Sequence, residues 1–330
     1  MPKMIRVGLV GLGRMGSSMA LNIAKAGFPL SMYDAEEGRT HELRENWVKD
    51  KHLSPGPGGL CTPNLHPRES PADVMLSSDV CLVCVHSEQQ TIDVVAGDEG
   101  LLTVGSSAMA DKVIVDHGTI SPRFAKTMAE TIAKAGGSFL DAPISGGPQG
   151  AQDGTLSIMV GGESKHLDTC MAVFQAMGSR IEHMGPTGAG AAAKLVNQHL
   201  VVINTVAACE AYVLAKSLGL RDTAKLRDVL GASWGQSQML DYVLGDLLRV
   251  EEAGGDVEVL RRSLAPIKTI AKDAAIITRS AEQADASAEL FASARSWIEE
   301  TKKGGYSDCS FAAVAAVIEE RAGDAGNEGQ

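Results

Sequence analysis

The sequence predicts an α/β protein, with an N-terminal doubly wound domain followed by an all-α C-terminal domain that contains a long central helix. In the first half, short apolar runs alternate with helical patterns, which is typical of a parallel sheet with right-handed crossovers. In the second half, helical residues run from Gly188 to Ser217, about 30 positions or roughly 45 Å of helix at the standard rise. We expect the boundary near Met184, with domains at residues 1–184 and 185–330.

Five short runs of β-branched and other apolar residues predict buried parallel strands. Strands that alternate with helices bring their carboxyl ends to one edge of the sheet, where ligands bind. The predicted strands are Met4–Val10, Leu30–Tyr33, Val80–Val85, Val113–Val115 and Ser138–Ala142, and the predicted helices, besides the long one, are Ser17–Ala26, Arg123–Ala135, Thr223–Leu230, Leu264–Ser280 and Ser287–Thr301.

One segment of the first half does not fit a compact α/β unit. Residues 52–71 contain eight glycines and prolines, a density that breaks regular structure. We expect an inserted surface loop here. A tolerated insertion is favoured over a functional lid, because long surface loops cost little stability.

The formal net charge of −11 argues against a nucleic-acid partner, which needs a basic face, and against docking on an anionic membrane. The most apolar long stretch, Leu195–Leu214, includes Asn197, Asn204 and Glu210 and is too polar for a bilayer span. Strand-like sequence begins within a few residues of Met1, which leaves no room for a signal peptide. We therefore expect a soluble, cytoplasmic protein.

The cysteines and histidines do not predict a metal site. Six cysteines are too few for a disulfide scaffold and favour a reducing compartment. Cys81 and Cys84 lie in a strand-like run, where residues three apart point to opposite faces, so we expect them to pack in the core. His86 and His117 follow strands without a carboxylate-rich ligand set at recognisable spacing.

A glycine-rich hexapeptide directly follows the first predicted strand and opens the first helix. Its glycines permit a tight turn, close approach of the backbone to a pyrophosphate, and helix–strand contact, while the helix N-terminus offers N–H groups to phosphates. Glycine turns are common, but here the strand, the helix and a following acidic residue occur together. We expect a Rossmann-type dinucleotide site at Gly11, Leu12, Gly13, Arg14, Met15 and Gly16.

The acidic residue is Asp34, at the end of the second predicted strand. A carboxylate there accepts hydrogen bonds from ribose hydroxyls and repels a 2′-phosphate, which favours NAD over NADP. Arg39 keeps NADP open, because an arginine can accommodate that phosphate; the alternative for Asp34 is a solvated charge at a strand end. Two further strand ends, at Val85-His86 and at Thr119, should line the same crevice.

Two later segments carry candidate chemistry. Ser145, Gly146 and Gly147 follow the fifth predicted strand, and small residues at such a junction leave backbone N–H groups exposed, a suitable seat for a carboxylate. A plain glycine turn is the equal alternative. Lys194 lies on the long helix with Asn197 and Gln198 at i+3 and i+4, so the three share one face.

The surroundings of Lys194 suggest proton transfer. A lysine among alanine, leucine and valine is poorly solvated, which lowers its pKa toward the range that acid/base chemistry needs. The alternative is a surface lysine on an amphipathic helix. It fits less well on a helix with so few other charges near this position.

Three signatures resemble the β-hydroxyacid dehydrogenase family, which includes 3-hydroxyisobutyrate dehydrogenase, tartronate semialdehyde reductase and L-threonate dehydrogenase. They are Gly11–Gly27 (GLGRMGSSMALNIAKAG), Asp141–Gly162 (DAPISGGPQGAQDGTLSIMVGG) and Gly188–Gln198 (GAGAAAKLVNQ). Asp116–Pro122 (DHGTISP) and Lys272-Asp273 resemble two further family segments. Together they span nearly the whole chain in the family's order.

The resemblance implies a role for each matching residue. Lys194 would be the catalytic lysine, Ser145, Gly146 and Gly147 would hold the substrate carboxylate, Asn197 or Gln198 would orient the substrate, and Thr119 and Lys272 would contact the cofactor. Gln198 stands where many members have a second asparagine, and Gly118 replaces a common serine. The proline-rich insertion has no counterpart in a typical member.

The resemblance also implies an activity, NAD-dependent oxidation of a small β-hydroxyacid to its semialdehyde or ketoacid, or the reverse, with Lys194 as general acid/base. It implies a homodimer or homotetramer. The alternatives are an NADP-dependent semialdehyde or imine reductase and a non-catalytic NAD-binding protein; a 6-phosphogluconate dehydrogenase would need a longer C-terminal half. Trp234 and Gln236–Gln238 either line the pocket or, for the tryptophan, pack in the core.

Overall fold

The fold comes from a computed structural model, which describes residues 4–49, 64–263 and 265–327. The chain divides into two compact units, Met1–Lys194 and Leu195–Gln330. This division lies inside the long helix, whereas the sequence placed it before that helix, near Met184. Each unit is described by itself.

The N-terminal unit is built on a sheet with the strand order β3-β2-β1-β4-β5-β6-β8-β7, with β9 paired to β8. The pairs from β3 through β6 are parallel, as predicted, and all five predicted strands are present. The strands are β1 (Val7–Val10), β2 (Leu30–Tyr33), β3 (Leu65–Pro67), β4 (Val80–Val83), β5 (Val113–Asp116), β6 (Ser138–Asp141), β7 (Ile144–Ser145), β8 (Leu156–Gly161) and β9 (Gly178–Gly185).

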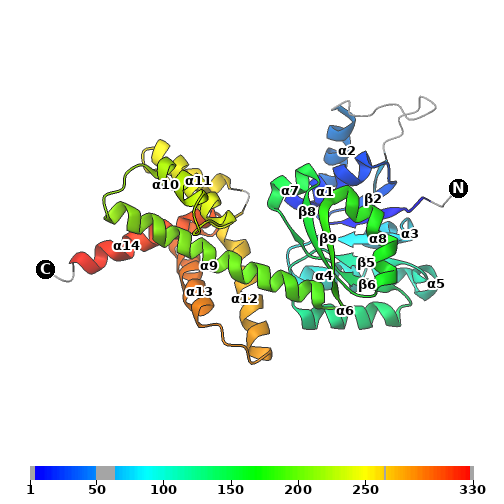
Figure 1. The fold of residues 1–330 in the computed structure, drawn as a ribbon. Coiled ribbons are helices and arrows are strands. Elements are labelled where there is room, and N and C mark those ends of the chain that lie inside the picture. Colours follow the sequence, from blue (N-terminus) through cyan, green and yellow to red (C-terminus); the bar gives the residue numbers. More distant parts are fainter. Residues whose placement is uncertain (1–3, 50–63, 264, 328–330) are drawn as a thin grey trace. The chain divides into compact units, whose positions relative to one another are not determined.

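Helices pack on both faces of this sheet, because alternate strand residues point to opposite sides. Leu9 and Leu82 share one apolar core with α1 and α8, while Cys81 and Val83 share another with α3, α4 and α6 (Figure 1). The helices are α1 (Arg14–Lys25), α2 (Arg39–Lys49), α3 (Pro71–Leu76), α4 (Glu88–Ala96), α5 (Ser106–Met109), α6 (Pro122–Lys134), α7 (Gly147–Asp153) and α8 (Ser164–Met177), with a 3₁₀ turn η1 (Leu101–Val104).

The structure corrects part of the predicted insertion. Residues 50–63 lie outside the described residues, but Leu65–Pro67 forms the edge strand β3, parallel to β2. Pro67 ends an edge strand and Pro71 occupies the first turn of α3, two positions where a proline costs no hydrogen bond. Ser70 caps α3 by accepting a hydrogen bond from the Asp73 amide. The loop predicted at residues 52–71 therefore contains a strand, and its last residue begins a helix.

The sheet also departs from a purely parallel arrangement after β6. Strand β8 runs antiparallel to β6 and β7, and β9 then pairs parallel to β8. Strands β8 and β9 were not among the predicted strands. They extend the sheet to the residues just before the long helix.

The described residues of the C-terminal unit form helices and short helical turns, with one isolated bridge between Pro266 and Ser310. Apolar residues of α9, α11, α12 and α13 share one core. The elements are α9 (Ala189–Ser217), which begins in the first unit, α10 (Thr223–Gly231), α11 (Gln238–Glu252), η2 (Val257–Arg262), α12 (Ile267–Gln283), α13 (Glu289–Thr301), η3 (Lys302–Tyr306), η4 (Phe311–Ala313) and α14 (Val314–Asn327).

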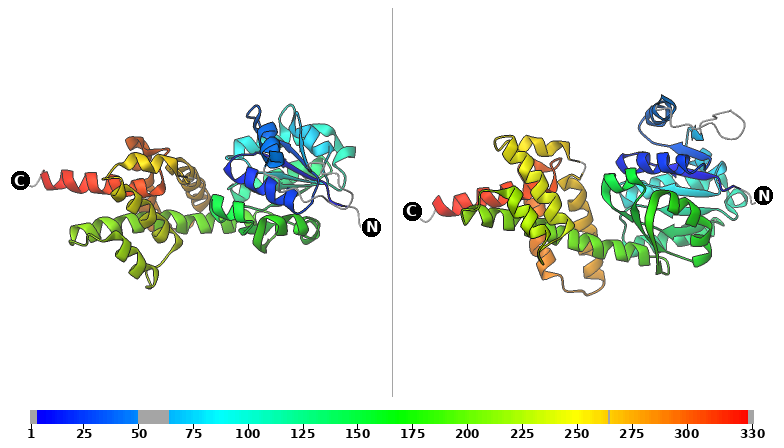
Figure 2. Two further views of the ribbon diagram at one scale, coloured as in Figure 1. Left: turned by 90° about the horizontal axis from the view of Figure 1, so that it is seen from above. Right: turned by 45° about the horizontal axis from the view of Figure 1, so that its top comes forward.

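The helix α9 confirms the predicted long helix almost residue for residue, and it is continuous in the views of Figure 2. By length and composition alone it is the one described helix that could cross a membrane. One of its faces packs in the core of the C-terminal unit through Val202, Val206 and Cys209. Trp234, in contrast, is fully exposed, so of its two alternatives the one in which it packs in the core is wrong.

Candidate functional site

The glycine-rich turn between β1 and α1 has a separate steric reason for each glycine. Gly11 has φ +96°, and a Cβ there would lie 2.3 Å from the Cys84 carbonyl oxygen. A Cβ on Gly16 would lie 1.9 Å from the Gly11 carbonyl oxygen. A Cβ on Gly13 would meet nothing within 4 Å, so the missing side chain leaves open space beside the backbone. Two glycines thus close the turn, and the third leaves it open to a ligand.

The start of α1 is suited to an anion. Gly13 is its N-cap residue and offers no side chain to the first-turn amides, and the first turn contains no acidic residue. The partial positive charge of a helix N-terminus favours a phosphate at such a place. These features fit the pyrophosphate of a dinucleotide against residues 13–16.

Asp34 lies beside this turn. Its carboxylate is nearly buried and accepts hydrogen bonds from the Leu12 amide at 2.6 Å and the Glu36 amide at 2.8 Å. Arg39 Nη1 lies 3.0 Å from Asp34 Oδ1, and the Arg39 guanidinium also pairs with Glu36. The alternative of a solvated strand-end charge is therefore wrong. The sequence could not show that two carboxylates engage Arg39.

The remaining cofactor candidates of this unit lie at the same edge of the sheet. Val85 and His86 follow β4, and Thr119 follows β5, both of which run parallel to β1. The Val85 side chain would lie 3.1 Å from a Cβ on Gly11, and the exposed His86 donates its amide to Gln90 Oε1. The structure thus brings these residues together with the glycine-rich turn, as expected from parallel strands.

His117 is a structural residue of this layer. Its buried ring donates from Nδ1 to the Ala142 carbonyl oxygen at 2.7 Å and packs edge-on against Phe174. Burial lowers the pKa of His117 to about 4, so the ring is neutral at pH 7. In the described ranges no three His, Cys, Asp or Glu side chains are grouped to hold a metal ion.

Cys81 and Cys84 occupy the neighbouring strand region. Cys81 lies inside β4 with no exposed surface, and burial raises the pKa of both thiols to about 12. Buried thiols of this kind are unreactive as nucleophiles. Their packing confirms the core assignment.

The candidate carboxylate seat lies between β7 and α7. Gly146 has φ +132° and Gly147 has φ +63°, conformations that favour glycine. Both glycines are exposed and Ser145 is half-buried, so the backbone and the hydroxyl are accessible in this unit. Asn22 Nδ2 donates to the Ala151 carbonyl oxygen at 2.7 Å and ties α7 to α1. The seat is therefore anchored to the helix that begins at the glycine-rich turn.

A second buried carboxylate, which the sequence analysis did not assign, lies at the start of α9. Asp141 accepts hydrogen bonds from the Gly188 and Ala191 amides, each at 2.8 Å. Burial raises the pKa of Asp141, and the bonds from backbone amides counteract that rise. Asp141 stands at the head of the Asp141–Gly162 signature, but its partners lie 47 and 50 residues further along, so no local spacing points to this contact.

Lys194 follows one turn later on α9 and is 7% exposed. This burial rules out the alternative of a solvated surface lysine. It leaves a basic side chain held in the protein, which is unusual for lysine outside functional or paired sites.

The other candidates on α9 belong to a hydrogen-bonded chain within the C-terminal unit. Asn197 Nδ2 donates to Gln198 Oε1 at 3.0 Å, and Gln198 Nε2 donates to Asp273 Oδ2 at 2.5 Å. Lys272 Nζ lies 2.9 Å from Asp273 Oδ1, so the aspartate holds both Gln198 and Lys272. In the sequence, Asp273 stands out only as part of the Lys272-Asp273 segment that resembles the family. Only the structure shows that Asp273 is almost completely buried and that it contacts both Gln198 and Lys272.

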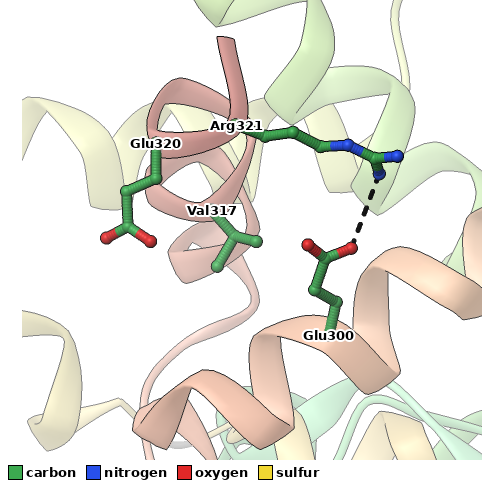
Figure 3. A pocket seen from close by; sticks show the side chains of 4 residues that line it. All are labelled: Glu300, Val317, Glu320 and Arg321. Carbon is green, nitrogen blue, oxygen red and sulfur yellow. Dashed lines mark ion pairs between the residues drawn. The ribbon is translucent and has the colours of Figure 1, made fainter. Parts of the chain in front are cut away.

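Two cavities of the C-terminal unit lie away from the predicted site residues. One, of about 340 Å³, is lined by Glu300, Val317, Glu320 and Arg321, with Arg321 Nη1 3.6 Å from Glu300 Oε2 (Figure 3). Another, of about 320 Å³, lies between α9, α11 and α14 and includes Tyr212, Lys216 and Glu251. Neither is lined by a predicted site residue.

The doubly wound unit, with its glycine-rich turn and Asp34, is typical of a dinucleotide-binding oxidoreductase. A helical unit that follows such a domain is typical of the same class. Residues 6–185 match the family described as the NAD binding domain of 6-phosphogluconate dehydrogenase. Residues 188–318 match the family described as NAD-binding of NADP-dependent 3-hydroxyisobutyrate dehydrogenase. The chain belongs to the β-hydroxyacid dehydrogenase family.

Individual relatives agree with this family. A 2-hydroxy-3-oxopropionate reductase of Escherichia coli is 33% identical over 72% of this chain and 74% of its own length. An NAD-dependent L-serine dehydrogenase of Pseudomonas aeruginosa is 27% identical over 96% of this chain and 98% of its own. The crystal structure of 3-hydroxyisobutyrate dehydrogenase from Salmonella typhimurium shares the fold, with a TM-score of 0.77 at 22% identity over 95% of this chain and 99% of that one.

Proposed function

We propose that the protein is an NAD-dependent dehydrogenase that oxidises a small carboxylate-bearing β-hydroxyacid to its semialdehyde or ketoacid, or catalyses the reverse reaction. The observation that carries the proposal is a buried lysine, Lys194, one turn into a helix whose start is tied to the nucleotide-binding sheet. The names of the relatives support a small hydroxyacid as substrate.

In this proposal Lys194 Nζ, as a neutral amine, takes the proton of the substrate hydroxyl while the C–H bond of the same carbon gives up its hydride and the C=O bond forms. Bound NAD supplies the hydride acceptor. In the reverse direction the protonated lysine returns the proton to the developing alkoxide.

The remaining candidates hold the substrate. The Ser145 hydroxyl and the backbone at Gly146 and Gly147 bind its carboxylate, while Asn197 or Gln198 orients its hydroxyl-bearing end. Asp273 keeps Gln198 and Lys272 in place through the contacts described above. Lys272 and Thr119 contact the cofactor.

Asp34 supports NAD over NADP. A 2′-phosphate beside this nearly buried carboxylate would meet a negative charge. Arg39, which could offset that charge, is already paired with Asp34 and Glu36. The cofactor preference therefore depends on whether this pairing persists.

A screen of NAD reduction tests the proposed activity. The purified protein is assayed with 3-hydroxyisobutyrate, threonate, glycerate, serine and related hydroxyacids, with NAD and NADP in parallel, by the absorbance of the reduced cofactor. Turnover of at least one β-hydroxyacid, faster with NAD, is expected. NAD binding without turnover of any hydroxyacid would instead support the non-catalytic alternative.

An exposed apolar stripe on α9 supports a homo-oligomer. Val196, Leu200 and Leu214 of α9, with Leu218 directly after its last residue, are each more than half exposed, and at 100° per residue they fall within an arc of about 40°. An apolar stripe of this length on one helix is typical of a contact with a second copy of the same chain. The opposite face of α9 packs in the helical core, which supports a soluble homodimer or homotetramer rather than a membrane protein. We also propose a cytoplasmic location, as expected from the sequence.

Light scattering of charged variants tests the oligomer. Leu200→Glu and Leu214→Glu should lower the measured mass toward that of one chain, because a charge in an apolar contact is costly. Leu290→Glu is the matched control, since Leu290 is also more than half exposed, on α13, but lies off the stripe. A mass unchanged in all three variants would contradict the assignment of this face.

A further inference from the structure

We propose that Asp141 is a positioning residue for the reaction, because it holds the first turn of α9 against the sheet and thereby fixes the place of the Lys194 amine. The inference rests on the proposed function, since it takes Lys194 as the acid/base. It concerns a contact that lies wholly within the N-terminal unit.

The carboxylate of Asp141 is used in full. It ends β6 and has no exposed surface. Its Oδ1 accepts the amide of Gly188, the residue just before α9, and its Oδ2 accepts the amide of Ala191 in the first turn. Amides in the first turn of a helix have no acceptor within that helix. A buried carboxylate at the positive end of a helix makes strong, charge-assisted bonds, so this side chain determines where α9 begins.

Close packing of the start of α9 against the sheet further restricts its position. A Cβ on Gly190 would lie 2.3 Å from the Met159 carbonyl oxygen and 2.5 Å from the Asp141 carbonyl oxygen. A Cβ on Gly161 would lie 2.6 Å from either carboxylate oxygen of Asp141. The helix backbone therefore rests directly on β6 and β8, and the Asp141 carboxylate lies in the same close contact.

The position of Lys194 follows from this anchor. It lies three residues after Ala191, the second amide partner, and residues three apart lie one above the other on a helix. A rotation or shift of the first turn moves the lysine stem with it. Proton transfer needs donor and acceptor within hydrogen-bond distance, and a misplacement of about 1 Å can cost about 100-fold in rate.

The variant Asp141→Asn tests the proposal. Asparagine has the same shape, but it accepts only one of the two amides and turns an NH₂ group toward the other. With the best substrate of the screen, kcat should fall by about 10- to 100-fold, and the Kd for NAD, measured by titration calorimetry, should change by less than about twofold.

A double-mutant cycle separates positioning from a general structural effect. In the Lys194→Ala background, Asp141→Asn should cause no further loss of the residual turnover, because the group that it positions is absent. The control is Ser70→Ala, which removes the hydrogen bond that caps α3 in the same unit. It should lower thermal stability and leave kcat unchanged.

The outcomes are distinct. If Lys194→Ala retains full turnover, the proposed chemistry and this inference fail together. If Lys194→Ala is inactive while folded Asp141→Asn keeps its kcat, or lowers turnover equally in both backgrounds, only the inference fails. Should Asp141→Asn not fold, Asp141→Glu, which keeps both acceptors but displaces them by one methylene, carries the same expectations; if neither folds, the role of Asp141 is structural and the inference is overturned.

Discussion

The helices α1 and α9 both begin within the N-terminal unit, close to the carboxyl ends of parallel strands, and their starts are built in opposite ways. At the start of α1, a Cβ on Gly13 would meet open space, and the first turn has no acidic residue. At the start of α9, a Cβ on Gly190 would meet three backbone atoms within 2.8 Å, and Asp141 accepts two of the amides. One helix start is left available to an anionic ligand, whereas the protein's own carboxylate fills the other.

The difference explains how one edge of a sheet can serve both binding and chemistry. A phosphate can use the positive end of α1 because no protein carboxylate of that helix competes for it. The positive end of α9 is already neutralised, so this helix has a structural task, and its second turn carries Lys194.

The largest effect is expected from Gly16→Ala. The added methyl group would lie 1.9 Å from the Gly11 carbonyl oxygen, a backbone atom that cannot move without distorting the turn. We expect a loss of about 3 kcal/mol in the free energy of unfolding together with loss of NAD binding. Urea denaturation and calorimetric titration with NAD measure the two effects. Normal NAD affinity in this variant would contradict the packing described for the turn.

Acidification should destabilise the N-terminal unit through His117, whose ring bonds the carbonyl of Ala142, the residue after Asp141. The pKa of its buried ring is about 4, against an ordinary value of 6.5, so the unfolded chain binds a proton that the folded protein does not. Stability from this residue is therefore complete above pH 6.5 and is lost as the pH falls toward 4, by up to about 3 kcal/mol. The free energy of unfolding, measured by denaturation at a series of pH values, should depend less on pH for His117→Asn than for the unmodified protein. An equal dependence on pH in the two proteins would contradict the assignment.

Gly13→Ala should separate binding from folding at the open helix start. The structure has room for the methyl group, so we expect the free energy of unfolding to change by less than about 0.5 kcal/mol. NAD affinity should fall by about tenfold or more, because a lost contact of about 1.4 kcal/mol corresponds to that factor. An unchanged Kd for NAD would show that the pyrophosphate does not approach this glycine.

The smallest effect concerns cofactor choice. Asp34→Ser removes the carboxylate that pairs with Arg39 and leaves the guanidinium closer to a ribose 2′-phosphate. The ratio of kcat/KM for NAD to that for NADP should fall several-fold, measured under identical conditions. Glu36→Gln is the control, since it removes the other partner of Arg39 without touching Asp34. A ratio that stays constant in Asp34→Ser would place the selectivity elsewhere.

The open helix start was largely predictable from the sequence, and the closed one was not. The strand, the glycine spacing and Asp34 lie within one local βαβ pattern, where the period of the apolar residues and the backbone needs of glycine suffice. The bounds of α9 were equally evident from its composition. The contact of Asp141 with Gly188 and Ala191, in contrast, joins residues far apart in sequence, and only the packing of β6 against α9 reveals it.

Other features escaped prediction for similar reasons. The strand β3 is three residues long and includes a proline, and only pairing with β2 makes it a strand. The antiparallel pairing of β8 with β6 depends on tertiary packing rather than on local periodicity. The pairing of Arg39 with Asp34 and Glu36 depends on side-chain conformations, which spacing does not determine.

The proposed reaction depends most directly on the buried amine of Lys194, and the variant Lys194→Ala measures its contribution. Lys216→Ala on the same helix is the matched control, since Lys216 pairs with Glu319 and has no part in the proposed reaction. We expect Lys194→Ala to lower kcat by about 10²- to 10⁴-fold with an NAD affinity changed by less than about twofold, and the control to keep its turnover. Full turnover by Lys194→Ala would contradict the proposed acid/base role.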